Sequence, residues 1–240
     1  MKNILKINIF FYFLLIISIL IGKFKMFIFL TLITLFHEIG HIITGLLFNY
    51  KIEKIIILPI GSLTIFNKKI NTNILEELLV TIMGPLFQVM LFFFIKQDIY
   101  LRYNMYLLIF NLLPIYPLDG HKILKLFLYK FFSFDKVNIY SLYFSILVLI
   151  ILLIYRPTSI IMYFIFIIYF IQIVKEFYLN KFIFNKFLFE RYLYGTRYKK
   201  KLLIKGDIKD KMHFNKSHLF IIENKLFNEQ EILGKMFDNP

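Results

Sequence analysis

The feature that most constrains this chain is a series of long apolar runs separated by short polar turns. About 20 apolar residues are enough for a helix to cross the hydrocarbon core of a bilayer. Soluble domains contain about a quarter charged residues, whereas this chain of 240 residues is 18% charged and 59% hydrophobic. We therefore predict an all-α polytopic membrane protein with about six transmembrane helices. The expected segments are roughly 7–22, 26–48, 74–95, 99–116, 138–155 and 157–179.

The net charge of +14 raises the possibility of a nucleic-acid partner. Basic residues beside membrane segments also fix orientation and contact anionic lipid, and no nucleic-acid-binding motif accompanies the charge here. We therefore expect a lipid bilayer and no nucleic acid. Lys and Arg concentrate between alternate segments and in the tail from residue 175, which predicts that both termini are cytoplasmic.

The second apolar segment contains the ionisable sequence "HEIGH", residues 37–41. His37 and His41 are four residues apart, so on a helix both imidazoles lie on one face and can bind the same metal ion. Neutral imidazoles favour zinc, and Glu38 lies where a general base could reach water at that metal. Since ionisable groups inside a membrane span are functional by default, the motif predicts a catalytic zinc site.

A catalytic zinc site normally has three protein ligands, so a third is required. Glu76 and Glu77 begin the third segment and are expected to cap that helix. Asp119 follows the helix-breaking prolines of "NLLPIYPLDGHKI" (111–123), in an otherwise apolar stretch, and is the preferred candidate. His121 is an alternative ligand, although we expect it to face the cytoplasmic surface.

Two further regions do not have the pattern of membrane helices. Residues 51–67 contain Ile-rich stretches around Pro59-Ile60-Gly61, which predicts a short β-hairpin at the inner membrane face. The composition becomes charged and polar after the sixth segment, which predicts a core over 1–180 and a basic amphipathic linker with a small cytoplasmic tail over 181–240. His213 and His218 are expected to be surface residues of that tail.

Three motifs in this order resemble the site-2 protease family of intramembrane zinc metalloproteases. They are HEIGH, "GPL" (84–86) and "NLLPIYPLDG" (111–120), and the likeness is closest to the stage IV sporulation protein FB group. The resemblance implies a Zn²⁺ site of His37, His41 and Asp119, with Glu38 as catalytic base. It also implies that Asn111 is substrate-binding and that the hairpin is a platform for substrate.

The same resemblance implies a membrane-associated protein substrate, such as a pro-sigma-K-like sigma-factor precursor in sporulation. It further implies a bacterial cell membrane, an inhibitory membrane partner and a likeness of residues 217–237 to part of a CBS domain. The chain departs from the family at His121, where glycine is usual, at Gln88, where histidine or asparagine is common, and in its short tail. The alternative function is a divalent-metal transporter using the same His/His/Asp set, which would not need Glu38 as a base.

Overall fold

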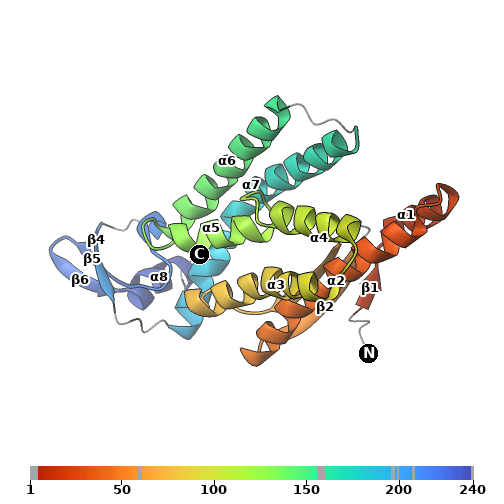
Figure 1. Cartoon of the computed structure of the whole chain (residues 1–240). Coiled ribbons are helices and arrows are strands. Elements are labelled where there is room, and N and C mark those ends of the chain that lie inside the picture. Colours follow the sequence, from red (N-terminus) through yellow and green to blue (C-terminus); the bar gives the residue numbers. More distant parts are fainter. Residues whose placement is uncertain are drawn as a thin grey trace. The chain divides into compact units, whose positions relative to one another are not determined.

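The computed structural model describes residues 5–58, 61–155, 160–195, 198, 200–206 and 209–238 (Figure 1). The Pro59-Ile60 part of the expected hairpin turn lies outside these residues. The chain divides into two compact units, one of residues 1–68 and 75–113 and the other of residues 69–74 and 114–240.

The first unit combines four helices with a three-stranded sheet. The strand order is β1-β2-β3, in which β1 pairs parallel with β2 and β2 pairs antiparallel with β3. The predicted hairpin is therefore confirmed, and β3 is an edge strand. The elements are β1 (Leu5–Ile7), α1 (Ile9–Leu20), α2 (Phe24–Leu47), β2 (Lys51–Leu58), β3 (Gly61–Asn67), α3 (Ile74–Phe94) and α4 (Asp98–Asn111).

Helices α2 and α3 of this unit cross closely at two glycines. A Cβ atom at Gly40 would collide with the backbone carbonyl of Met83, and one at Gly84 would collide with the imidazoles of His41 and His37. Pro85 lies inside α3, which continues through it. The GPL motif therefore packs directly against the histidines.

The second unit contains four helices, a short 3-10 helix and a second sheet. The sheet order is β4-β5-β6, with β4 parallel to β5 and β5 antiparallel to β6. Helices α6 and α7 lie side by side (Figure 1). The elements are α5 (Asp119–Leu128), α6 (Phe134–Ile154), α7 (Ile160–Tyr194), β4 (Lys201–Lys205), η1 (Lys209–Lys211), β5 (Ser217–Ile222), β6 (Lys225–Asn228) and α8 (Glu229–Phe237).

The core of the second unit surrounds a fully buried arginine at the end of α7. Arg191 donates to Glu229 Oε1 (3.0 Å), to Asn71 Oδ1 (2.9 Å) and to the carbonyls of His213 and Lys216. Its guanidinium also lies 4.5 Å from the centroid of the Phe187 ring, which stacks on Phe134 at 4.0 Å. These contacts join the 69–74 segment, α7 and the C-terminal sheet into one unit.

Four helices are long and apolar enough to cross a membrane among the described residues: α2, α3, α6 and most of α7. Helix α1 has 12 residues and α4 has 14, so the predicted count of six spans is not confirmed. The mainly helical fold is confirmed. The first of its two small sheets adds β1 to the predicted hairpin, and the second contains β4, β5 and β6.

Several expectations at the level of elements and residues need correction. The sixth apolar segment belongs to a longer helix, because α7 continues to Tyr194 and stays helical through the charged stretch. The strand–strand–helix pattern suggested by residues 217–237 is present as β5, β6 and α8. His121 and His218 are not surface residues: they are 3% and 2% exposed. The CBS likeness and the boundary at 180 stay predictions.

Candidate metal centre

The HEIGH motif lies in the middle of α2 and is buried there. His37, Glu38 and His41 are 6%, 7% and 7% exposed. Polar side chains on the same helix satisfy themselves locally, as Thr34 and Thr44 donate to carbonyls three and four residues earlier. The two histidines differ because their ring nitrogens contact groups of α3 and each other.

The Nδ1 atom of each imidazole faces a hydrogen-bond acceptor on α3. His41 Nδ1 lies 2.7 Å from the Val80 carbonyl, and His37 Nδ1 lies 2.9 Å from Gln88 Oε1. The Gln88 amide is oriented by Asn104, because Gln88 Nε2 donates to the Asn104 carbonyl and side chain at 3.1 Å. Each Nδ1 must therefore carry the proton, which leaves an unprotonated Nε2 on each ring.

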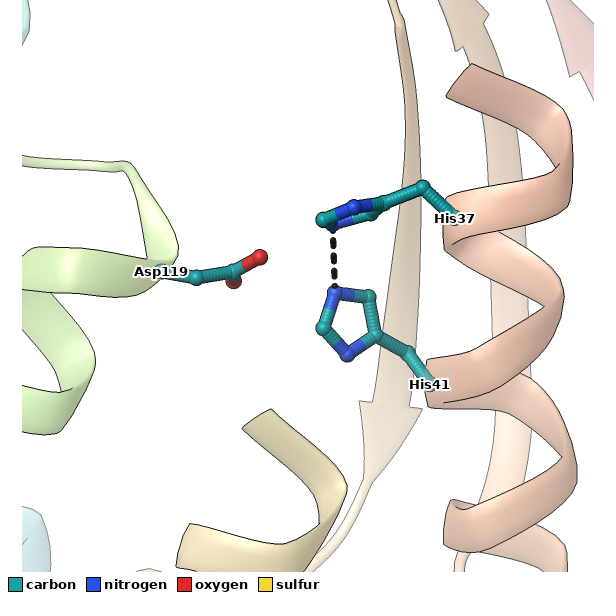
Figure 2. A group of neighbouring side chains, drawn as sticks. All are labelled: His37, His41 and Asp119. Carbon is teal, nitrogen blue, oxygen red and sulfur yellow. Dashed lines mark hydrogen bonds between the residues drawn. The ribbon is translucent and has the colours of Figure 1, made fainter. Parts of the chain in front are cut away.

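These two Nε2 atoms face each other at 3.1 Å, as Figure 2 shows. Two lone pairs at that distance repel, and a cation between them removes the repulsion. Two nitrogen ligands of a tetrahedral zinc, each at about 2.0–2.1 Å, lie about 3.3 Å apart. An Nδ1–H bonded to a backbone or amide oxygen is also the usual outer support of a metal-binding histidine. The donor set and its supports therefore fit a divalent metal.

Glu38 lies beside the imidazoles and faces the edge strand β3. The Thr64 backbone N–H donates to Glu38 Oε1 at 2.8 Å, and the Ser62 hydroxyl donates to Oε2 at 3.4 Å. Since β3 pairs with β2 on its other side, the Thr64 N–H belongs to the open edge of the sheet. The hairpin thus holds the carboxylate next to the histidines.

The remaining predicted site residues lie at the ends of two helices. Asn111 is the last residue of α4 in the first unit and is half-buried. Asp119 is the first residue of α5 in the second unit, is buried, and pairs with Lys122 at 2.9 Å. Figure 2 draws Asp119 with the two histidines. The structure brings together His37, Glu38 and His41 within one unit.

His121, the alternative ligand, lies in the first turn of α5 and packs its ring against Tyr116 at 5.4 Å between centroids. Its Nε2 is buried and has no hydrogen-bond partner among the described residues. The sequence did not predict helix α5. Because His121 is buried in the first turn of that helix, the expected surface position of His121 is wrong.

Sequence reasoning missed the groups that orient the imidazoles. Gln88 was noted only as a departure from the family, and neither the Val80 carbonyl nor Asn104 was singled out. A usable signal existed: Gln88 and Asn104 are amides within apolar segments, and both are almost completely buried at 1% and 0% exposed. A buried amide in a membrane helix needs a partner, which points to a nearby polar site.

Known proteins provide an independent comparison. No family model matches the chain. The chain is 35% identical over 133 residues to stage IV sporulation protein FB of Bacillus subtilis, covering 50% of this chain and 46% of the relative. It is 34% identical over 126 residues to a zinc metalloprotease of Methanocaldococcus jannaschii, covering 46% of this chain and 36% of that relative. The matches thus span less than half the length of either relative.

A solved structure, the site-2 protease of Methanocaldococcus jannaschii, extends the comparison to most of the fold. Its TM-score to this chain is 0.55 with 26% sequence identity, and the match covers 72% of this chain and 89% of the solved one. The zinc metalloprotease relative, the fold of the solved site-2 protease and the paired imidazoles on α2 agree with one another. In sequence and in fold, the chain is therefore similar to membrane metalloproteases of the site-2 protease family.

Proposed function

We propose that this protein is a zinc-dependent endopeptidase that hydrolyses a peptide bond in or near a membrane segment of another protein. The observation that carries the proposal is the pair of unprotonated Nε2 atoms 3.1 Å apart, with the Glu38 carboxylate beside them. A site with this donor set is suited to holding a metal, and the adjacent carboxylate supplies the base that hydrolysis requires.

The proposed metal ligands are His37, His41 and Asp119. All three are buried side chains of metal-binding type. Two neutral imidazoles and one carboxylate leave a net positive charge on Zn²⁺, and they complete the three protein ligands usual in catalytic sites. When bound, zinc acidifies water and polarises a carbonyl group. Asp119 also pairs with Lys122 at 2.9 Å, which holds its carboxylate at the start of α5.

Glu38 is the proposed general base. Its carboxylate accepts a proton from the attacking water and delivers that proton to the nitrogen of the departing peptide chain. The Thr64 N–H and the Ser62 hydroxyl hold the carboxylate in position. Because both groups belong to the edge strand β3, a substrate segment that pairs with this edge would lie next to the base. Asn111 is proposed to contact the substrate backbone.

The proposed substrate is a membrane-associated regulatory protein. A sigma-factor precursor of the pro-sigma-K type and control by an inhibitory membrane partner are the finer proposals, and the similarity to a sporulation protein agrees with a role in sporulation. The proposed location is a bacterial cell membrane with both termini in the cytoplasm, in agreement with the basic tail.

Co-expression of the full chain with candidate membrane-tethered precursors tests this function. Glu38→Gln should reduce cleavage by about 10²–10⁴-fold, with zinc content unchanged. Glu76→Gln, which alters another acidic residue at the start of α3, serves as the matched control and should cleave normally. Substantial cleavage by purified Glu38→Gln would refute the assignment of the base. Metal uptake that survives Glu38→Gln, with no cleavage by wild type, would favour the transporter instead.

A further inference from the structure

The loop that leads into Asp119 has few hydrogen-bond donors of its own. Two of residues 114–118 are prolines, which have no backbone N–H. Within the loop, the Leu118 N–H donates to the Ile115 carbonyl at 2.8 Å, and α5 begins directly after Leu118. A short loop with so little internal hydrogen bonding takes its conformation from the side chains that surround it.

Ser145 of α6 holds the backbone of this loop at two points. Its hydroxyl oxygen accepts from the Tyr116 N–H at 3.1 Å, and its hydrogen is shared between the carbonyls of Pro114 (3.2 Å) and Ser141 (3.0 Å). Ser145 and Ile115, the residue between the two attachment points, are both 0% exposed. Bulk water therefore cannot replace these hydrogen bonds, and the loop backbone is fixed to α6.

Glu176 of α7 holds the side chain of the same loop residue. The Tyr116 hydroxyl donates to Glu176 Oε2 at 2.9 Å, and a hydrogen bond to a carboxylate is stronger than one between neutral groups. The Tyr116 ring also packs edge-on against His121 in the first turn of α5, with the centroids 5.4 Å apart. Tyr116 is thus attached through its backbone to α6 and through its side chain to α7, and it contacts the helix that begins with Asp119.

A second serine of α6 provides an internal comparison. Ser141 lies one helical turn before Ser145, and it is also 0% exposed. The Ser141 hydroxyl donates to the Asn138 carbonyl of its own helix at 3.0 Å and has no partner outside α6 among the described residues. The two serines are equally buried on the same helix, and their hydroxyls differ in contact with the loop before Asp119.

We propose that Ser145 and Glu176 are positioning residues of the metal centre, because they fix Tyr116 and thereby the turn that presents the Asp119 carboxylate. This role depends on the proposed function of Asp119 as a metal ligand. Asp119 follows Tyr116 by three residues, so a shift of the loop moves the carboxylate with it. Groups that orient a metal ligand typically contribute about 10–100-fold to metal affinity.

Zinc affinity of the purified full chain, measured by competition with a chelator, tests both positions. Ser145→Ala and Glu176→Leu should each weaken zinc binding about tenfold, whereas Ser141→Ala, the matched control, should leave it unchanged. Glu176→Gln keeps an oxygen acceptor for Tyr116 and should recover most of the affinity, a rescue that a general loss of stability would not show. Equal affinities of wild type, Ser145→Ala and Glu176→Leu would overturn the proposal.

Cobalt in place of zinc adds a readout of coordination geometry. Because the visible absorption of Co²⁺ depends on the arrangement of its ligands, the spectra of Ser145→Ala and Glu176→Leu should differ from that of wild type, and the spectrum of Ser141→Ala should not. Identical spectra for all four proteins would also overturn the proposal. Wild type that binds neither metal would refute the proposed metal centre itself. Loss of zinc in Asp119→Ala, with wild-type affinity in Ser145→Ala and Glu176→Leu, would refute the positioning role alone.

Discussion

The two units each contain a pair of neighbouring histidines, and the protein uses the two pairs in opposite ways. In the first unit, His37 and His41 direct their Nδ1 atoms to oxygens of α3 and turn their Nε2 atoms toward each other. In the second, both ring nitrogens of His218 are used by the protein, because Nδ1 donates to Glu229 at 2.6 Å and Nε2 accepts from the His213 backbone.

The difference lies in what each polar cluster leaves for a ligand. Around Arg191, the guanidinium donates to the Glu229 carboxylate, to Asn71 Oδ1 and to two backbone carbonyls, so the cluster closes on itself. At the HEIGH motif, lone pairs converge on one point. Burial and histidine content alone do not separate the two cases. The direction of the nitrogen lone pairs separates the two clusters: they converge at HEIGH and are used within the protein around Arg191. Four changes to the chain test this distinction.

The largest effect is expected at Asp119. Asp119→Ala should lose zinc and reduce cleavage to background, because two imidazoles leave the metal short of a third protein ligand. Asp119→Asn should be nearly as damaging, since a neutral amide is a poor zinc ligand, whereas His121→Ala should keep its zinc. Zinc content measured by mass spectrometry on the three purified proteins decides the question. Full zinc in Asp119→Ala together with loss in His121→Ala would reverse the assignment.

Breaking the closed cluster should act on stability and not on metal. Arg191→Met leaves the buried Glu229 without its cation, and loss of one partner of a buried pair typically costs about 3–5 kcal/mol. Hydrogen exchange should therefore increase throughout β4–β6 and α8, while zinc content stays at the wild-type value. Lys186→Met, at an exposed position of α7, is the control and should leave exchange unchanged. Zinc loss in Arg191→Met would contradict the separation of the two clusters.

Gln88 tests the outer support of the convergent pair. Gln88→Leu removes the acceptor for His37 Nδ1, and changes of this kind typically weaken metal affinity about 10–100-fold. Gln88→Glu keeps the oxygen acceptor for His37 but turns a second carboxylate oxygen toward the two Asn104 oxygens, so it should recover only part of the affinity. Competition with a chelator measures the change, and Met90→Leu, at a half-exposed position of α3, is the control. Equal affinities for Gln88→Leu and wild type would mean that Gln88 does not orient the ligand.

The smallest effect is a pH dependence of the tail. Burial, followed by the charges of Lys216, His218 and Arg191, lowers the pKa of His213 to about 4. Burial also lowers the pKa of His218, although Glu229 opposes the shift. The unfolded tail therefore takes up protons below about pH 6.5, before the folded tail does. Stability of the tail should fall from about pH 6.5 to about pH 4.

Hydrogen exchange of β4–β6 across that interval measures the loss. His213→Gln removes one of the two titrating groups, so its exchange should depend less steeply on pH than that of wild type. A profile identical to wild type would exclude His213 as a contributor.

The sequence predicted those parts of the molecule that depend on spacing along the chain. HEIGH places two imidazoles on one helical face, Ile-rich runs form the hairpin, and Pro114 and Pro117 follow the end of α4. The orientation of the rings could not be predicted, because it depends on how α3 is rotated against α2. That rotation brings the Val80 carbonyl and Gln88 to the Nδ1 atoms, and residue spacing contains no information about it.

Other misses have simple physical causes. Strand β1 has three residues, which is too short to show a period, and it is recognisable only by its pairing with β2. Helix α7 extends beyond its apolar residues to Tyr194, because a helix is held by backbone hydrogen bonds that charged residues also form. His218 lies in a polar segment, so composition suggested an exposed position, whereas the Glu229 carboxylate and the His213 backbone N–H supply the partners that permit its burial.

The contact of Gly84 with the two imidazoles has a consequence for how this protein can vary. A Cβ atom at that position would occupy the space of the His41 and His37 rings. Even the smallest side-chain change, a single methyl group, therefore acts directly on the spacing of the nitrogens, although residue 84 contributes no functional group. In a library of random mutants, position 84 would behave as an active-site position, and inactive clones there would be well-folded proteins that no longer retain zinc.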